Sequence, residues 1–354
     1  MKSVAIKSVE VWFPTRIRHS SEWPTTVVEK WRERLAKVVP TAAADDTAEG
    51  VRLTLAAIAA HRDDPFQGVV EVRVIDAADD SSDLETRAAQ QALARAGISA
   101  TDIDLLLSHP MVPDYLCVNP GSIVHHKIGL RPEVQAFGVD GVCTSFIIQL
   151  DLARKAILSG DARYVLATQS SACTRLMPEA DPFSSWFGDA GGAAVLQAAE
   201  PGFGLLATSF RTWGEHCRAF CATVPGGRWY EGGRVVAANE DRAGARKMQL
   251  EAADIARDLI AALLAKAGVL HEEVAFFAPH QPAAWFPELC RSRAGLGAAK
   301  MAQTSSFTGN LSTVNIPAQL ATATREGLLK RGDVVVLFAL ASGMSAAGAV
   351  LRWS

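Results

Sequence analysis

GVCTSFIIQLDLA, residues 141–153, decides the fold of this chain. Its first residues are small and follow an apolar run, and the rest has the pattern of an amphipathic helix. Cys143 stands where the predicted strand gives way to the helix. Because the N-terminus of a helix carries partial positive charge, it favours the thiolate over the thiol. The stretch predicts a strand–helix junction that presents a nucleophilic cysteine, and a buried structural cysteine is the alternative.

The overall composition excludes several classes of protein. The chain has 354 residues, of which 49% are hydrophobic, enough for one large α/β domain or two packed halves. With 21% charged residues and a net charge of -3, we expect neither nucleic acid nor a membrane surface as a partner. No apolar run reaches the roughly 18–20 residues of a membrane span. Residues 1–6 predict a first strand rather than a signal peptide, so we expect a cytoplasmic protein.

The six cysteines are scattered along the chain and do not have the pattern of a disulfide framework. His216, Cys217 and Cys221 lie close together, as metal ligands often do. No second ligand pair at zinc spacing follows them. We therefore expect no metal, and no cofactor of another kind.

Two pairs of segments indicate an internal duplication. ALARAGISATDIDLLLSHP (92–110) resembles LLAKAGVLHEEVAFFAPHQ (263–281), and aligning the two places His109 on His280. ILSGDARYVLATQSSA (157–172) resembles LLKRGDVVVLFALASG (328–343). Each segment predicts a helix that ends at glycine, followed by a buried strand.

The duplication predicts an α/β fold of two similar βα halves, residues 1–200 and 201–354. Sites in such folds form beyond the carboxyl ends of the strands, so packed halves could bring Cys143 and His280 together. Residues 20–80 have no counterpart in the second half. They predict helices joined by an Ala/Asp-rich turn, which we expect to be an insertion capping the first half.

Three further segments place polar or small residues near the ends of predicted strands. His280 could exchange a proton or hold an oxyanion, although a lone histidine is more often structural. Asn310 could be a second fixed donor, although Gly-Asn before a helix is normally a loop and cap. Ser342 follows a buried strand among small residues, where backbone N–H groups could form an oxyanion hole or merely allow tight packing.

Together these motifs give the chain its resemblance to a known family. The sequence resembles the β-ketoacyl-acyl-carrier-protein synthase III group of the thiolase-fold condensing enzymes. The resemblance runs from VEVWFPTRIR (9–18) to GAVLRW (348–353), except for the insertion. It is carried by the Cys143 junction and by three motifs in the family's order and spacing: WFGDAGGAAVL (186–196), PHQ (279–281) and GNLS (309–312).

The resemblance implies a fold and roles for these residues. The halves would pack as a layered αβαβα sandwich, with the chain usually forming a homodimer. Cys143 would take the acyl group as a thioester, while His280 and Asn310 polarise the carbonyl of the incoming group. The backbone N–H groups of Cys143 and Ser342 would hold the tetrahedral oxyanion.

The chain departs from the coenzyme A-using members in two places. Those members carry a Trp and an Arg in an early segment ending in Thr-Gly-Ile, and SEWPTTVVEKWRERL (21–35) stands in that region. They also carry an Arg five residues after the catalytic His, where this chain has Trp285. Because Trp offers no charged fork for phosphate, we favour an acyl carrier protein over acyl-CoA as donor.

Four residues are weaker candidates for the substrate pocket or its entrance. Trp285 is the first. Trp229 lies in the Gly-rich stretch VPGGRWYEGG (224–233), either a lid or a plain hairpin. Tyr115 and Leu116 lie in the loop that, in related dimers, reaches toward the partner's pocket.

Three functions remain open at this point. The first is an acyltransferase of polyketide or antibiotic biosynthesis, which passes the acyl group from Cys143 to a hydroxyl, an amine or a carrier thiol. The acceptor is then a small molecule or is bound to a carrier. The second is decarboxylative condensation with a malonyl thioester, as in a starter-unit β-ketoacyl synthase. The third is a non-catalytic partner subunit of a synthase.

Overall fold

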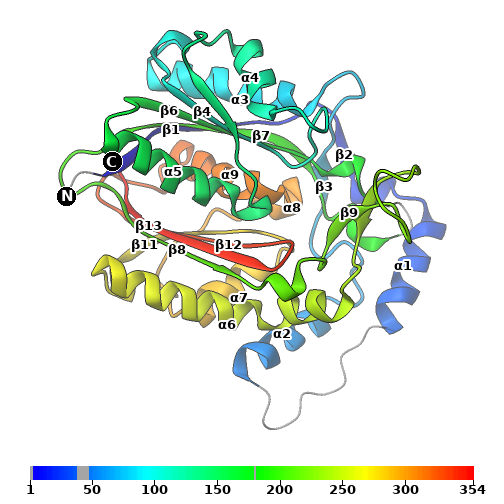
Figure 1. Ribbon diagram of the computed structural model, residues 1–354. Coiled ribbons are helices and arrows are strands. Elements are labelled where there is room, and N and C mark those ends of the chain that lie inside the picture. Colours follow the sequence, from blue (N-terminus) through cyan, green and yellow to red (C-terminus); the bar gives the residue numbers. More distant parts are fainter. Residues whose placement is uncertain (1–2, 38–47, 179–180) are drawn as a thin grey trace.

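The structure is a computed structural model and describes residues 3–37, 48–178 and 181–354. In Figure 1, helices, a sheet, central helices, a second sheet and further helices follow one another from top to bottom. The predicted αβαβα sandwich is therefore confirmed. The predicted Ala/Asp-rich turn of the insertion falls on residues 38–47 and lies outside the described residues.

The first sheet is built entirely from strands of the first half. They are β1 (Val4–Trp12), β4 (Leu105–Pro110), β5 (Gln135–Gly138), β6 (Tyr164–Ala172) and β7 (Asp189–Ala198). Their order is β1-β7-β6-β4-β5, with β6, β4 and β5 parallel and β7 antiparallel to both of its neighbours. Helices α3 (Ser81–Ala96) and α4 (Pro120–Ile128) cover its outer face through a core of alanine, leucine and valine.

The second sheet is built from strands of the second half. They are β8 (Gly204–Thr212), β11 (Val274–Pro279), β12 (Val334–Ala341) and β13 (Ser345–Arg352), in the order β11-β12-β13-β8. Helices α6 (Arg242–Ala267) and α7 (Phe286–Arg293) cover its outer face. Although α6 is long, no helix in the described part of the chain is long and apolar enough to cross a membrane.

The central layer contains α5 (Ser145–Ser159) and α9 (Asn315–Arg325), one from each half. The largest core cluster lies here, where side chains of both helices meet the inner faces of both sheets. Each helix follows a 3₁₀ turn, Val142–Thr144 before α5 and Ser312–Val314 before α9. The packing thus brings two helix N-termini far apart in sequence to one place.

The insertion forms helices and a short strand that pairs with the strand just before it, as Figure 1 shows. Strand β2 (Ile17–His19) leads into it, and its own elements are α1 (Thr25–Lys37), α2 (Glu49–Ala60) and β3 (Glu71–Arg73). Strand β2 pairs with β3. We expected it to cap the first half. The insertion contacts both halves. Helix α2 packs on α6 and α7 of the second half, where Glu49 forms an ion pair with Arg293 at 3.2 Å. On the first half, Arg34 of α1 forms an ion pair with Asp181 at 2.8 Å. The prediction of helices is confirmed. The sequence pattern within one half of the chain does not reveal which surfaces an inserted helix covers.

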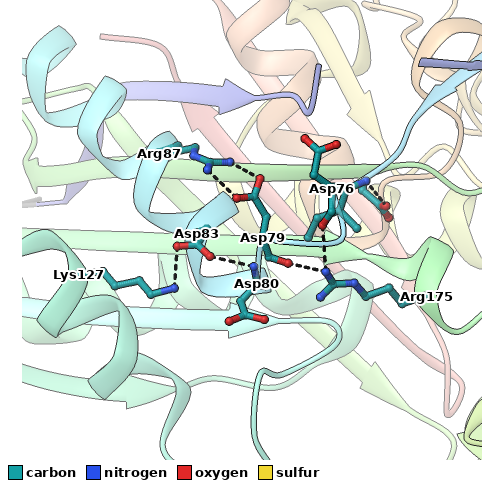
Figure 2. A network of polar contacts seen from close by, with 9 residues as sticks. Asp76, Asp79, Asp80, Asp83, Arg87, Lys127 and Arg175 are labelled. Carbon is teal, nitrogen blue, oxygen red and sulfur yellow. Dashed lines mark hydrogen bonds and ion pairs between the residues drawn. The ribbon is translucent and has the colours of Figure 1, made fainter. Parts of the chain in front are cut away.

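Polar contacts fix the chain where it returns from the insertion, as Figure 2 shows. Arg87 on α3 donates two hydrogen bonds to the Asp79 carboxylate, at 2.6 and 2.7 Å. Arg175, just beyond β6, donates to the backbone carbonyls of Asp76 and Asp79. This loop is therefore held against the end of β6, a strand that contacts the Ser312–Val314 turn before α9.

The remaining elements lie around the same end of the sheets. They are β9 (Cys221–Thr223), β10 (Val236–Ala238) and the short α8 (Ser305–Thr308). Strands β9 and β10 pair as a two-stranded ribbon, and α8 shortly precedes Asn310.

Candidate active site

Cys143 lies in a tight turn between β5 and α5. Val142 just before it has a φ of +52°, a left-handed conformation that costs a β-branched residue free energy. A Cβ on Gly141 would lie 2.3 Å from Ile148 Cδ1, so a larger residue there would require the Ile148 side chain to move. The turn places the thiol at the start of α5, as the sequence predicts, and leaves Cys143 only 8% exposed.

His280 and Asn310 come from the second half and lie side by side. His280 follows β11, and its backbone N–H donates to the Phe338 carbonyl at 2.7 Å. Asn310 follows Gly309, whose φ is +65° and whose Cβ position is blocked by the Trp186 carbonyl at 2.5 Å. His280 Nε2 lies 3.0 Å from Asn310 Oδ1, and both residues are 5% exposed.

Asn310 Oδ1 is held by two further donors. It accepts from the Ser312 backbone N–H and from Asn315 Nδ2, both at 2.8 Å. Because these donors fix the oxygen toward His280, His280 Nε2 must carry the proton. Among the described residues, the buried His280 Nδ1 has no hydrogen bond of normal geometry.

The two halves meet at the Cys143 thiol. Its Sγ lies 3.4 Å from Ser312 Oγ. The His280 ring and the Ser342 backbone N–H lie close enough to lower the pKa of the thiol. The structure thus brings Cys143, His280, Asn310 and Ser342 together. An N–H aimed at the sulfur is placed to stabilise charge that develops on or beside it.

Electrostatics in this cluster favour an ionised thiol. Burial raises the pKa of Cys143, but the His280 charge and the hydrogen bonds outweigh it and hold the thiol pKa below its usual range. Burial lowers the pKa of His280, but the thiolate, Asn310 and the nearby Leu340 carbonyl raise it above its usual value. The pair therefore favours thiolate and imidazolium, the state in which Cys143 is nucleophilic.

The alkylation of Cys143 by iodoacetamide is expected to depend on pH in a defined direction. Because its pKa is lowered, the thiolate and hence the alkylation rate should appear at lower pH than in free cysteine. In His280→Ala, burial acts without the opposing imidazolium, so the midpoint of the pH–rate curve should move upward. Peptide mass spectrometry after timed quenching measures both curves.

Cys117, which is exposed, is the internal control in the same digests. Its alkylation should have the same pH dependence in both proteins. Identical Cys143 curves with and without the histidine would contradict an ion pair between Cys143 and His280.

Sequence reasoning missed Ser312 and Asn315 as parts of this cluster. Ser312 has a φ of +51°, which matches the left-handed Val142 before the thiol. Both lie shortly after Asn310, and the duplication pairs this turn with the Cys143 turn. That symmetry was the available signal, because Ser and Asn at a helix start otherwise indicate a cap.

The four weaker candidates make no hydrogen bond to the thiol among the described residues. Tyr115 and Leu116 are exposed in the loop between β4 and α4, and Trp229 is exposed between β9 and β10. Trp285 is partly buried and donates from Nε1 to Gln67 Oε1 at 2.9 Å. Within the described ranges, no hydrogen bond or ring contact joins these four to Cys143. Their role in a pocket stays a prediction.

Two family models match the two segments of the chain that contain the site residues. Residues 137–214 match the family described as 3-oxoacyl-[acyl-carrier-protein] synthase III. Residues 264–353 match the family described as 3-oxoacyl-[acyl-carrier-protein] synthase III C terminal. The matches contain Cys143 in the first segment and His280 and Asn310 in the second.

Curated relatives match over most of their length. β-Ketoacyl-[acyl-carrier-protein] synthase III of Rhodobacter capsulatus is 31% identical over 284 residues, covering 77% of this chain and 84% of that protein. The enzyme of the same name from Syntrophomonas wolfei is 30% identical over 292 residues, covering 81% of this chain and 87% of that protein.

Solved structures share the whole fold. The 3-oxoacyl-[acyl-carrier-protein] synthase III of Aquifex aeolicus VF5 superposes with a TM-score of 0.76 and 23% identity, covering 99% of this chain and 100% of that one. A variant of OleA from Xanthomonas campestris superposes with a TM-score of 0.79 and 20% identity, covering 99% of this chain and 98% of that one. These similarities show a thiolase fold.

Proposed function

This chain belongs to the β-ketoacyl-acyl-carrier-protein synthase III family, and we propose that it is an acyltransferase in which Cys143 carries the acyl group. The observation that carries the proposal is the buried thiol between the His280 ring and the Ser342 N–H, with its pKa lowered. A thiolate in this setting attacks thioester carbonyls.

The first step forms the acyl-enzyme. Cys143 Sγ attacks the carbonyl carbon of the donor thioester, and the oxyanion is held by the backbone N–H groups of Cys143 and Ser342. The intermediate then expels the donor's thiolate, which takes a proton from the His280 imidazolium. The products are a thioester on Cys143, a free carrier thiol and a neutral His280.

The second step transfers the acyl group to a new nucleophile. An acceptor hydroxyl, amine or carrier thiol gives its proton to neutral His280 as it attacks the Cys143 thioester. Collapse of the intermediate releases the Cys143 thiolate and restores the starting ion pair. The same histidine thus acts as acid in one step and as base in the other.

We propose an acyl carrier protein, rather than coenzyme A, as the donor's carrier. Trp285 lies where coenzyme A-using members carry an arginine, and its indole is engaged by Gln67 of the insertion. This contact joins two uncharged side chains. A phosphopantetheine arm on a carrier protein must reach Cys143, but it needs no binding site for a nucleotide. We further propose that the chain acts as a homodimer in the cytoplasm, in a polyketide or antibiotic pathway.

Decarboxylative condensation is the second candidate, and the placement of Asn310 favours it. With Asn310 Oδ1 engaged by three donors, its Nδ2 is left as the side chain's donor for an enolate oxygen. In that reaction the malonyl thioester loses carbon dioxide and its enolate carbon attacks the Cys143 thioester.

Release of carbon dioxide separates the two candidates. Acyl-enzyme is prepared with a hexanoyl-carrier protein, freed of donor, and mixed with malonyl-carrier protein carrying a ¹⁴C-carboxyl label. We expect no release above that of the Cys143→Ala protein, because transfer requires no decarboxylation. Label released together with a β-ketoacyl product would establish condensation instead.

A further inference from the structure

The first half contains a near copy of the His280–Asn310 pair. His109 stands at the end of β4, as His280 follows β11, and aligning the duplicated segments places one on the other. Asp140 stands two positions before the 3₁₀ turn that leads into α5, and Asn310 stands two positions before the turn that leads into α9. The two helices then begin at matching positions after these turns.

The two turns share one hydrogen bond, and in each a histidine lies near its acceptor oxygen, through a different ring nitrogen. Asp140 Oδ1 accepts from the Val142 backbone N–H at 3.0 Å, as Asn310 Oδ1 accepts from that of Ser312 at 2.8 Å. His109 Nδ1 lies 3.6 Å from the same Asp140 oxygen. His280 Nε2 lies 3.0 Å from the Asn310 oxygen.

The two pairs differ in where they face. His280 and Asn310 are both buried at the thiol, whereas the Asp140 side chain is 80% exposed and that of His109 only 4%. Burial lowers the pKa of His109 to about 4, so its ring is neutral at pH 7. Among their described contacts, His109 and Asp140 do not touch the Cys143 thiol. Any role of this pair in catalysis must therefore be indirect.

The residue that Asp140 holds is the strained one before the nucleophile. A left-handed φ is unfavourable for a β-branched residue, so Val142 needs contacts that keep it there. Its φ sets the direction in which the next residue, Cys143, leaves the turn. A different conformation at Val142 would turn the thiol away from the His280 ring and the Ser342 N–H.

We propose that Asp140 is a positioning residue for Cys143: its carboxylate, faced by His109, holds Val142 in the left-handed conformation that directs the thiol to His280. For catalysis this inference rests on the proposed acylation of Cys143. Alkylation by iodoacetamide needs no acyl donor, so it tests the positioning even if the proposed function is wrong.

Asp140→Ala is expected to slow Cys143 alkylation at pH 7 by about tenfold, because small displacements of a reacting group cost about this much or more. Asp140→Asn keeps the oxygen acceptor and should stay within about twofold of the wild type. Glu133→Ala, a change at another exposed acid of the same half, is the matched control and should have no effect. A wild-type rate in folded Asp140→Ala would overturn the proposal.

Glycine at position 142 provides a readout that a merely structural role would not move. Because glycine adopts a positive φ freely, Val142→Gly should restore the Asp140→Ala protein to within about threefold of the wild-type rate. If Asp140→Ala alone does not fold, the double variant carries the test, and its failure to fold or to react would overturn the proposal.

Single-turnover acylation supplies the second measurement. With hexanoyl-N-acetylcysteamine, Asp140→Ala should lower the saturating rate of Cys143 acylation about tenfold and leave the half-saturating concentration unchanged. If the wild type is not acylated but the alkylation pattern holds, the proposed function fails and the positioning inference stands. A higher half-saturating concentration with an unchanged saturating rate would assign Asp140 to substrate binding and overturn positioning.

Discussion

Cys143→Ala is expected to abolish acyl-enzyme formation and to reduce turnover on the order of 10⁶-fold. Removing the nucleophile of an acyl-transfer enzyme leaves only binding and the oxyanion donors, and losses of this order follow. Intact-mass spectrometry after incubation with a hexanoyl-carrier protein measures the adduct. The wild type should gain one hexanoyl group and the variant none.

Cys173→Ala is the matched control for that experiment. Cys173 is also fully buried, and burial raises the pKa of its thiol well above the ordinary value, so it should be a poor nucleophile. This variant should still gain one hexanoyl group. Acylation of Cys143→Ala would show that another residue is the acceptor. Failure of the wild type to be acylated would favour the non-catalytic subunit.

Asn310→Ala is expected to cause the second largest loss, in both activity and stability. Its Oδ1 serves three buried donors, namely His280 Nε2, the Ser312 N–H and Asn315 Nδ2. Buried donors without an acceptor cost about 1–3 kcal/mol each, so we expect the free energy of unfolding to fall by about 2–4 kcal/mol. Turnover should fall about 10²–10³-fold, because His280 loses the contact that orients it.

Urea unfolding and steady-state turnover measure these two effects. Asn315→Ala removes only one of the three donors and leaves the Asn310 oxygen in place. It should therefore lose about 1 kcal/mol and much less activity. An Asn310→Ala protein as stable as the wild type would show that this hydrogen-bond hub contributes little to the fold.

Much of the fold followed from the sequence because it depends on local patterns. Glycine-terminated helices and continuous apolar strands appear twice, and that repetition predicted two sheets with helices on their faces. The Cys143 turn was predictable for the same reason, since small residues, a thiol and an amphipathic run are neighbours in the chain. The family's motifs then grouped His280 and Asn310 with it.

The insertion shows where such reasoning ends. Its helices follow from periodicity, but α2 covers α6 and α7 of the second half while Arg34 of α1 pairs with Asp181 of the first half. Trp285 meets Gln67 although the two residues lie in different halves of the chain. An amphipathic pattern indicates that a helix has an apolar face to bury. It does not indicate which of several apolar surfaces that face will pack against.

The sequence by itself determined the residue types of the site and the strand ends on which they stand. Only the tertiary structure decided that Ser312 touches the thiol, that Asn310 Oδ1 joins three donors, and that Asp140 repeats this arrangement at the first turn. These contacts join segments that are distant in the chain, or they depend on which atom faces which. The packing of α5 against α9 between the two sheets sets them, and that packing is a property of both halves together.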